Sequence, residues 1–275
     1  MANSKTQKII KDTKGNEVVT IRTDKTLKDF METKPSSRWN PEFWYQKYDD
    51  NINELLRTKY TVNKVGDFEE KLTYGAIVTG SQKYYGRDYY LINQGDISFT
   101  GLDLSNARHV KKESPWVIER AMPKVDSIIL ARSGVGGVGK NRITIITKPI
   151  KAVVDSFVDL LDLNREKVNP YFVVVFWKSK FGWLQIERII NGVGTINISF
   201  DEIREINIPV LPDGVQKNIE SEYKKMSVFH DKAIKAKKKG DGAGYKKNIE
   251  TAEKMLKDLI SKTEAVIRGE RDDVI

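Results

Sequence analysis

The sequence contains no cysteine and only two histidines, His109 and His230, among its 275 residues. Disulfides, cysteine-ligated zinc, iron–sulfur clusters and thiol nucleophiles are therefore excluded. The two histidines lie far apart in the sequence, and neither has a second metal-ligand residue type at ligand spacing beside it. We therefore expect no metal site, and a packing or solvated role for each histidine.

Long apolar runs are also missing. No run reaches the roughly 20 residues that span a bilayer, and the start, MANSKTQKIIKD, has no apolar signal region. We therefore expect a soluble, cytoplasmic protein with no membrane partner.

Positive charge is in excess. The chain has 47 Lys and Arg residues against 38 Asp and Glu, which gives a net charge of +9. The summed field attracts polyanions, so nucleic acid is the leading candidate partner. With 39% hydrophobic residues, the chain can also fill a core, which excludes the disordered class.

Residues 1–35 are expected to form an N-terminal appendage. Two β-prone runs, Lys8–Lys11 and Glu17–Arg22, flank the turn-like Lys14-Gly15-Asn16 and predict a small hairpin. A Ser/Asn/Pro start and a dense aromatic cluster follow. They predict a short helix that docks through Trp39, Phe43, Trp44 and Tyr48.

Residues 36–214 are predicted to form a globular, β-rich α+β domain. From about Val62 to Pro212, Gly, Asn and Asp separate short β-rich runs: DYYLI, GDISF, DSIILA, RITIIT, YFVVVFW, GTINISF and EINIPVL. The run Phe172–Trp177 is apolar throughout and should lie inside. Its length does not distinguish a strand from a turn of buried helix.

From Val215 to the end at residue 275 the period becomes helical. Apolar residues recur at helical spacing on both sides of the break KKKGDGAGY, and each arm would be about 35 Å long. Arms of this length imply a partner helix. They could form a coiled-coil spacer or a hairpin, since Gly240, Gly242 and Gly244 suit a chain reversal. The residues expected to face a partner are Met226, Phe229, Ile249, Leu256, Leu259 and Val266.

Three short motifs resemble catalytic ones. GVGGVGK at 134–140 has the spacing of a phosphate-binding loop, but Asn141 replaces the Ser or Thr that would hold magnesium, and a predicted strand follows. Asn169-Pro170-Tyr171-Phe172 resembles an adenine methyltransferase motif, without a glycine-rich cofactor loop upstream. The third motif is the bare string of a metal-dependent nuclease, Asp213, Glu222 and Lys224. A nucleotide-binding or nuclease enzyme remains an alternative, as does a basic helical interaction protein.

The stronger signal is a set of basic, loop-presented clusters. No acidic residue occurs between Asp126 and Asp155, where five cations surround a glycine-rich loop. Arg and Lys in such loops can contact phosphates, and Arg can also read guanine. The candidate DNA contacts are Lys83, Tyr85, Arg87, Arg108, Lys111, Lys112, Arg132, Ser133, Gly134, Lys140, Arg142, Lys178, Lys180, Trp183, Gln185 and Arg188.

Five motifs follow one another along the chain in a fixed order: SRWNPEFWYQKY, RDYYLINQGDIS, DSIILARSG, NPYFVVVFWKSKFGWLQIERIINGVGTINIS and DEIREINIPVLPDGVQKNI. Over residues 36–268 this set resembles the specificity (S) subunit of type I restriction-modification systems. The resemblance implies a non-catalytic target-recognition domain that reads part of a split DNA site, with recognition loops at Arg132–Gly139 and Lys178–Arg188. It also implies spacer helices at Val215–Arg268 that dock methyltransferase (M) subunits.

The family further implies where the chemistry resides. The M subunits bind S-adenosylmethionine and methylate adenine, and restriction (R) subunits translocate and cut, so the S subunit itself needs no cofactor. A typical S subunit has two recognition domains, whereas this chain has room for one, and no internal repeat is visible. We therefore expect a half-size subunit that forms a homodimer and reads an inverted, bipartite site.

This reading predicts that the purified chain, supplied with Mg²⁺, neither hydrolyses ATP nor cuts DNA. A phosphate-release assay and a plasmid-nicking assay measure the two activities. Either activity, if it copurifies with the chain through two separate columns, contradicts the non-catalytic reading.

Overall fold

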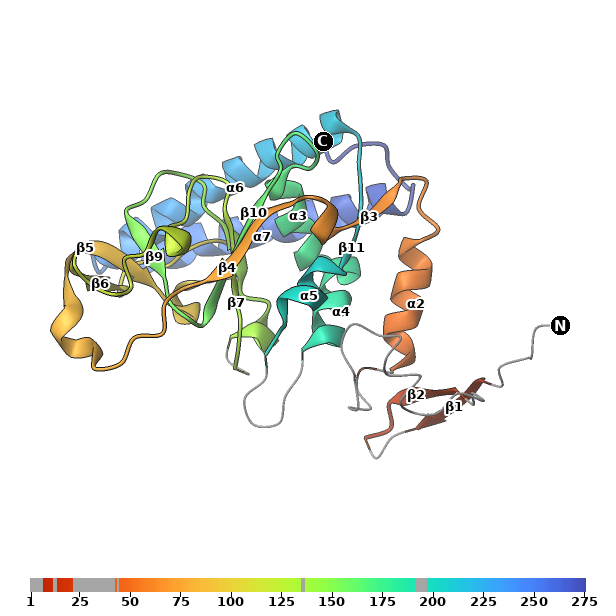
Figure 1. Ribbon diagram of the computed structural model, residues 1–275. Coiled ribbons are helices and arrows are strands. Elements are labelled where there is room, and N and C mark those ends of the chain that lie inside the picture. The colour runs from red at the N-terminus through yellow and green to blue at the C-terminus, as the bar shows by residue number, and fades with distance from the viewer. Residues whose placement is uncertain (1–6, 12–13, 22–42, 44, 135–136, 191–196) are drawn as a thin grey trace.

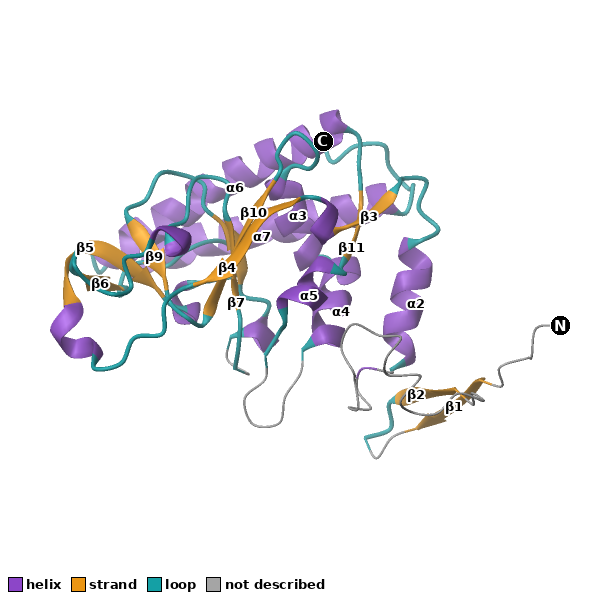
Figure 2. Cartoon of the chain, viewed as in Figure 1, coloured by secondary structure: helices purple, strands orange, loops and turns teal. Residues whose placement is uncertain are grey.

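The computed structural model describes residues 7–11, 14–21, 43, 45–134, 137–190 and 197–275 (Figure 1). It confirms the α+β class, with a sheet-rich part followed by two long helices. In Figure 2 the strands lie mainly on one side, the shorter helices on the other, and the long helices run along both. The domain boundaries at 35/36 and 214/215 stay predictions. Within the described residues, no helix is both long and apolar enough to cross a membrane.

The N-terminal hairpin lies where the sequence predicts it. Strands β1 (Gln7–Lys11) and β2 (Glu17–Ile21) pair antiparallel around Gly15, whose φ of 82° is one that glycine adopts easily. Helix α2 (Gln46–Leu55) follows the aromatic cluster and buries Tyr48 and Leu55. Trp39 and Trp44, two of the aromatics expected to dock it, lie outside the described residues.

Three sheets build the central part of the chain. A four-stranded antiparallel sheet has the order β4-β10-β7-β8: Glu69–Tyr74, Val158–Leu163, Ile128–Ala131 and Ile143–Ile145. A three-stranded sheet has the order β6-β5-β9, with β9 parallel to β5: Arg108–Val110, Tyr85–Ile92 and Ala152–Val154. A short antiparallel pair joins β3 (Val62–Lys64) to β11 (Asn207–Pro209).

Two of the predicted β-rich runs adopt other structures. The GDISF run starts in a 3-10 turn, Gln94–Asp96, because Asn93 and Asp96 cap each other's backbone. The YFVVVFW run is helix α3 (Pro170–Lys178), started by Asn169, whose side chain accepts from the Tyr171 N–H, and by proline at the first turn. Of the GTINISF run, residues 194–196 lie outside the described residues, and its last residue begins α5 (Phe200–Arg204).

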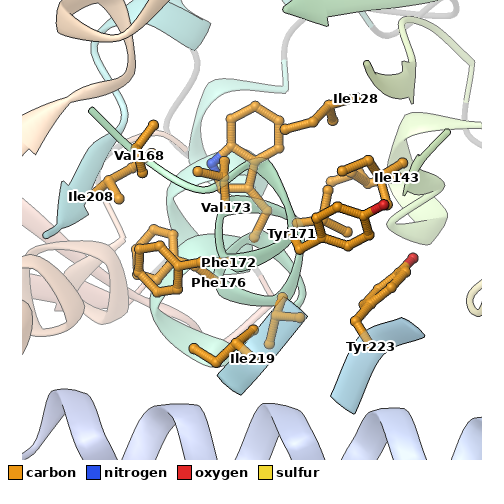
Figure 3. Close-up of a cluster of buried hydrophobic side chains, with 14 of the residues drawn as sticks. Ile128, Ile143, Val168, Tyr171, Phe172, Val173, Phe176, Ile208, Ile219 and Tyr223 are labelled. Carbon is orange, nitrogen blue, oxygen red and sulfur yellow. The ribbon is translucent and has the colours of Figure 1, made fainter. Parts of the chain in front are cut away.

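Helix α3 is the centre of the core. All nine of its residues are buried, and Tyr171, Phe172, Phe176 and Trp177 are fully so. Figure 3 shows Tyr171 beside Ile143 of the sheet and Tyr223 of the first long helix, and Phe172 and Phe176 on the opposite side of α3. A helix that is apolar on every side requires cover on every side.

The long helices supply part of that cover. Helices α6 (Asp213–Lys238) and α7 (Gly242–Ile267) form a hairpin that packs against α3. Of the two arrangements left open by the sequence, the hairpin is therefore the correct one. Four residues predicted to face a second copy are buried within the chain itself: Met226, Leu256, Leu259 and Val266, with exposed fractions of 0, 0, 3 and 0%.

The assignment of these four residues to a dimer surface is therefore wrong. Each helix of the hairpin has the other and α3 as partners, so the apolar stripe is already covered. Phe229 and Ile249 are only partly buried. A homodimer stays a prediction, with its surface outside the buried stripe.

Replacing Leu256 with alanine should lower the free energy of unfolding by about 2–5 kcal/mol, because a fully buried leucine leaves a cavity. Denaturant unfolding measures the loss. The neighbouring exposed Lys257, changed to alanine, should stay within about 0.5 kcal/mol of wild type. If Leu256→Ala keeps wild-type stability and only lowers the mass in solution, the original dimer assignment is restored.

Candidate nucleic-acid interface

Six of the sixteen candidate residues come together at one end of the β5–β6 pair. We call Lys83, Tyr85, Arg87, Arg108, Lys111 and Lys112 the β5–β6 cluster. Hydrogen bonds link its two strands: Lys111 Nζ donates to the Lys83 carbonyl (3.1 Å) and Arg108 Nη1 to the Tyr85 hydroxyl (3.1 Å). Figure 1 places this end of β5 at the left extremity of the molecule.

A glycine permits this close approach. A Cβ on Gly86 would lie 2.5 Å from Lys111 Cγ and 3.0 Å from the Lys111 backbone nitrogen. The strands also shift register between Tyr85 and Tyr89. Asp88 accepts from the Lys112 backbone N–H (2.9 Å), which fixes the end of β6 against β5. The cluster is thus presented on a tightly joined strand pair.

The charges of the cluster face solvent, and in the described part of the chain none of them is in an ion pair. Lys83, Arg87, Arg108, Lys111 and Lys112 are exposed. Among the described residues, no carboxylate oxygen lies within 4.0 Å of their side-chain nitrogens, in contrast to Lys64, which pairs with Glu205 at 2.5 Å. Exposed cations that are not in ion pairs can neutralise DNA phosphates, which releases the counterions condensed on the DNA.

In the predicted recognition loop at Arg132–Gly139, Arg132 bonds to residues of the fold, whereas the sequence predicted that it contacts DNA. Arg132 donates to Asp159 (3.1 Å) and lies between the rings of Tyr74 and Phe200, 4.4 and 4.9 Å from its guanidinium carbon. Asp159 is completely buried, and burial raises its pKa to about 7 despite the opposing charge of Arg132. Arg132 therefore joins the end of β7 to β10 and α5. The prediction that it is a surface cation is wrong.

Some of the other predicted residues in and after this loop also have partners inside the fold, whereas Lys140 is exposed. Arg142 Nη1 donates to the carbonyls of Gln94, Gly95 and Ile97 at 2.9–3.0 Å, so it holds the turn after β5. Ser133 is 5% exposed and bridges to Asn197, and Gly134 has φ 79°. Residues 135–136 lie outside the described residues. Of the predicted loop cations, Lys140 is exposed and has no described carboxylate within 4.0 Å.

The predicted recognition loop at Lys178–Arg188 is wrong, because this segment is the end of α3 and helix α4 (Lys180–Ile189). Ser179 caps α4 by accepting from the Gly182 N–H. Trp183 packs on the core. The side chain of Gln185 is buried and bonded to both backbone groups of Asn207, at 2.9 and 3.0 Å.

The cations of this segment are held inside the fold or in ion pairs. Lys178 is 7% exposed, and its Nζ lies 4.8 Å from the centre of the Phe99 ring. Lys180 pairs with Glu54 (2.8 Å), and Arg188 donates to Asp49 (2.9 Å) and to the Phe43 carbonyl (3.0 Å). These contacts stabilise the packing of α2 on α4, so the charges of Lys180 and Arg188 have partners within the fold.

The motifs of the enzymatic alternatives are not assembled as sites. Asp213, Glu222 and Lys224 all belong to α6, and nine residues of helix put Asp213 about 14 Å along the axis from Glu222. The loop at 134–140 is followed by strand β8, without the helix that would cradle phosphates. His230 is bonded to Thr100 and the Leu102 carbonyl, and His109 lies against Tyr90. In the described ranges, no three His, Cys, Asp or Glu side chains gather as a metal site would require.

No family model and no curated protein matches the chain. Among solved structures, the S subunit of a type I restriction-modification system from M. genitalium is similar, with TM-score 0.43 and 13% identity over 64% of this chain and 40% of that one. The type IIG restriction endonuclease BpuSI has TM-score 0.49 and 13% identity over 97% of this chain and 37% of that one. The HsdS subunit from Thermoanaerobacter tengcongensis has TM-score 0.41 and 10% identity over 82% and 52%.

The first and third of these proteins are specificity subunits, the family that the sequence resembles. The chain spans 37 to 52% of the length of the three proteins. With TM-scores below 0.5 and identities of 13% or less, this likeness carries no conclusion about activity or partners.

Replacing Lys178 with methionine should stabilise the protein at pH 7 and leave DNA affinity unchanged. Burial lowers the pKa of Lys178 to about 7 from the ordinary 10.5. Between these values the folded wild type binds fewer protons than the unfolded chain, so its stability rises with pH from about 7 to about 10.5.

Urea unfolding at several pH values should show this rise in wild type and in the control Lys180→Met, whose lysine is exposed, but a weaker rise in Lys178→Met. A loss of DNA affinity in Lys178→Met, with folding retained, would return Lys178 to the interface.

Proposed function

We propose that this chain is a DNA sequence-specificity subunit of a restriction-modification or methyltransferase complex, without catalytic activity of its own. Its sheet-rich part would act as a target-recognition domain for one part of a bipartite site. The proposal draws on the ordered motifs of the sequence and on the separation of free and paired cations in the structure.

One observation carries the proposal: the exposed cations of the β5–β6 cluster lack acidic partners, whereas other candidate cations hold the fold together. Arg132, Arg142, Lys180 and Arg188 all have partners inside the chain. Charged groups that fold stability does not use are the ones available for phosphates. The division favours a polyanion partner on this side of the molecule.

The position of the cluster also suits a duplex. β5 is eight residues long and is irregular between Tyr85 and Tyr89, which both pair with Val110. The cluster lies at the first end of β5. A turn follows the last end of β5, and Arg142 bonds this turn to the loop that bears Lys140. Two cation groups joined by one strand can contact separate phosphates of a duplex, while Arg87 and Tyr85 add side chains that can hydrogen-bond to base edges.

The wider assembly is part of the same proposal. Partner M subunits would bind S-adenosylmethionine and methylate adenine, and R subunits would cut where a system has them. The second recognition domain would come from a second copy of the chain, which makes the site an inverted repeat. The buried stripe of α6 and α7 is not available for pairing with a second copy. We therefore assign that pairing to another surface of the chain.

Changing Lys83, Arg87 and Lys112 together to glutamine should weaken binding to duplex DNA by about tenfold or more at 0.15 M salt. The slope of log K against log salt should fall by about 2 to 3, because each lost phosphate contact removes about 0.9. Fluorescence anisotropy with a 40-base-pair duplex, first of random sequence and then selected by the wild type, measures both quantities.

The matched control changes Lys59, Lys64 and Lys180 to glutamine, three exposed lysines that pair with Asp272, Glu205 and Glu54. It lowers the net charge equally and should bind nearly as wild type does. Equal losses in both variants would show that only net charge matters. Selection without any enriched motif would remove sequence specificity from the proposal.

A further inference from the structure

The turn of the α6–α7 hairpin concentrates the positive charge of the chain. Residues 232–247 contain seven lysines and one acidic residue, Asp241, a net charge of +6 beside +9 for the whole chain. All seven lysines are exposed. The sequence alone marked this segment only as a break between helices, although its run of lysines was visible.

Helix stability explains only part of this charge. Lys235, Lys237 and Lys238 lie in the last turn of α6, where cations favour the negative end of the helix dipole. Helix α7, however, has no acidic residue in its first turn, and Lys246 and Lys247 follow near its positive end. Cations at that end gain nothing from the dipole, so helix stability does not explain their position.

Most of these lysines have no carboxylate partner among the described residues. Lys237 pairs with Asp103, and Lys246 lies 4.0 Å from Glu250. For Lys232, Lys235, Lys238, Lys239 and Lys247, no described carboxylate oxygen lies within 4.0 Å of the side-chain nitrogen, while Asp241 caps α7 by accepting from the Gly244 N–H. The turn is therefore a patch of mutually repelling charge that a polyanion would neutralise.

The turn is joined to the β5–β6–β9 sheet. The Lys237 ion pair reaches the segment before β6, and Lys238 Nζ lies 5.9 Å from the centre of the Tyr90 ring on β5. Tyr90 in turn lies against His109, which follows Arg108 of the β5–β6 cluster, at 4.2 Å between ring centres. Figure 1 shows this end of α6 and α7 behind the sheet. The turn therefore adjoins the sheet that carries the β5–β6 cluster.

The composition of the turn favours DNA over a protein partner. Protein interfaces are depleted of lysine and enriched in aromatic residues, methionine and arginine. Between residues 235 and 247 the only large apolar side chain is that of Tyr245, which is half-buried and lies 5.7 Å from Lys237 Nζ. Lysine acts on phosphates as a mobile point charge and does not need an apolar anchor.

We propose that the α6–α7 turn is a second phosphate-binding surface, which holds the duplex beside the recognition domain without reading its sequence. This inference rests on the proposed function and extends the DNA footprint from the sheet to the end of the helical hairpin. The surface would add affinity equally for every sequence, because phosphate contacts carry no sequence information.

The test compares two triple variants of the full chain. Lys235, Lys239 and Lys247 are changed to glutamine in one, and Lys217, Lys225 and Lys257 in the other. The control lysines lie on the same helices, away from the turn, and pair with Asp213, Glu222 and Glu253. Glutamine has nearly the helix propensity of lysine, and both variants lose the same charge.

Anisotropy is measured with the random 40-base-pair duplex, with the selected duplex and with poly-L-glutamate. The turn variant should lose about tenfold or more in affinity for both duplexes, with a salt slope smaller by about 2 to 3 and an unchanged ratio between them. The control variant should bind nearly as wild type does.

Several outcomes overturn the inference. If the turn variant binds both duplexes as the control does, while the β5–β6 variant is weakened, the turn does not contact DNA and the proposed function stands. If the turn variant loses affinity only for poly-L-glutamate, the surface serves an acidic protein. A changed ratio between the duplexes means that the turn reads sequence. If the wild type binds neither duplex, the inference and the proposed function fail together.

Discussion

The burial of a helix that has no polar face is the constraint on which the fold depends. α3 buries nine consecutive residues, Pro170–Lys178. Neither the sheet nor the helical hairpin could cover it alone, since each contacts one side. The β7–β8 strands cover it on one side, and α6 and α7 on another, with α4 packed beside it. The apolar stripe of the hairpin is buried against α3 in this way, and this burial holds the hairpin against the rest of the fold.

The same constraint decides how charge is distributed. Because α6 is held against α3, its last turn reaches the β5–β6–β9 sheet, where Lys237 meets Asp103 and Lys238 meets Tyr90. Inside, the fold keeps only charges that are bonded or neutralised: burial raises the pKa of Asp159 and lowers that of Lys178. Outside, lysines and arginines without partners gather on the side that we propose faces DNA.

Short-range chemistry explains which elements the sequence could predict. Strands β5 and β7 contain the DYYLI and DSIILA runs, because β-branched and aromatic residues bounded by turns favour strands. The YFVVVFW run was ambiguous, since an apolar run of this length fits a strand or a buried helix. Strand β10 was not among the predicted runs. Its Asp159 and Asp162 are polar in the sequence, and their burial depends on partners from other elements, among them Arg132, Ser127 and Lys124.

The sequence by itself determined the absence of thiol chemistry, the excess of positive charge, two helical segments separated by a glycine-rich break, and an ordered set of motifs that resembles that of a specificity subunit. Only the tertiary structure decided which cations are free. Arg132 meets Asp159, Lys180 meets Glu54 and Arg188 meets Asp49 across 27, 126 and 139 residues of chain. The residues next to a cation in the sequence do not indicate such partners. The burial of apolar surface elsewhere in the fold brings the cation and its partner together.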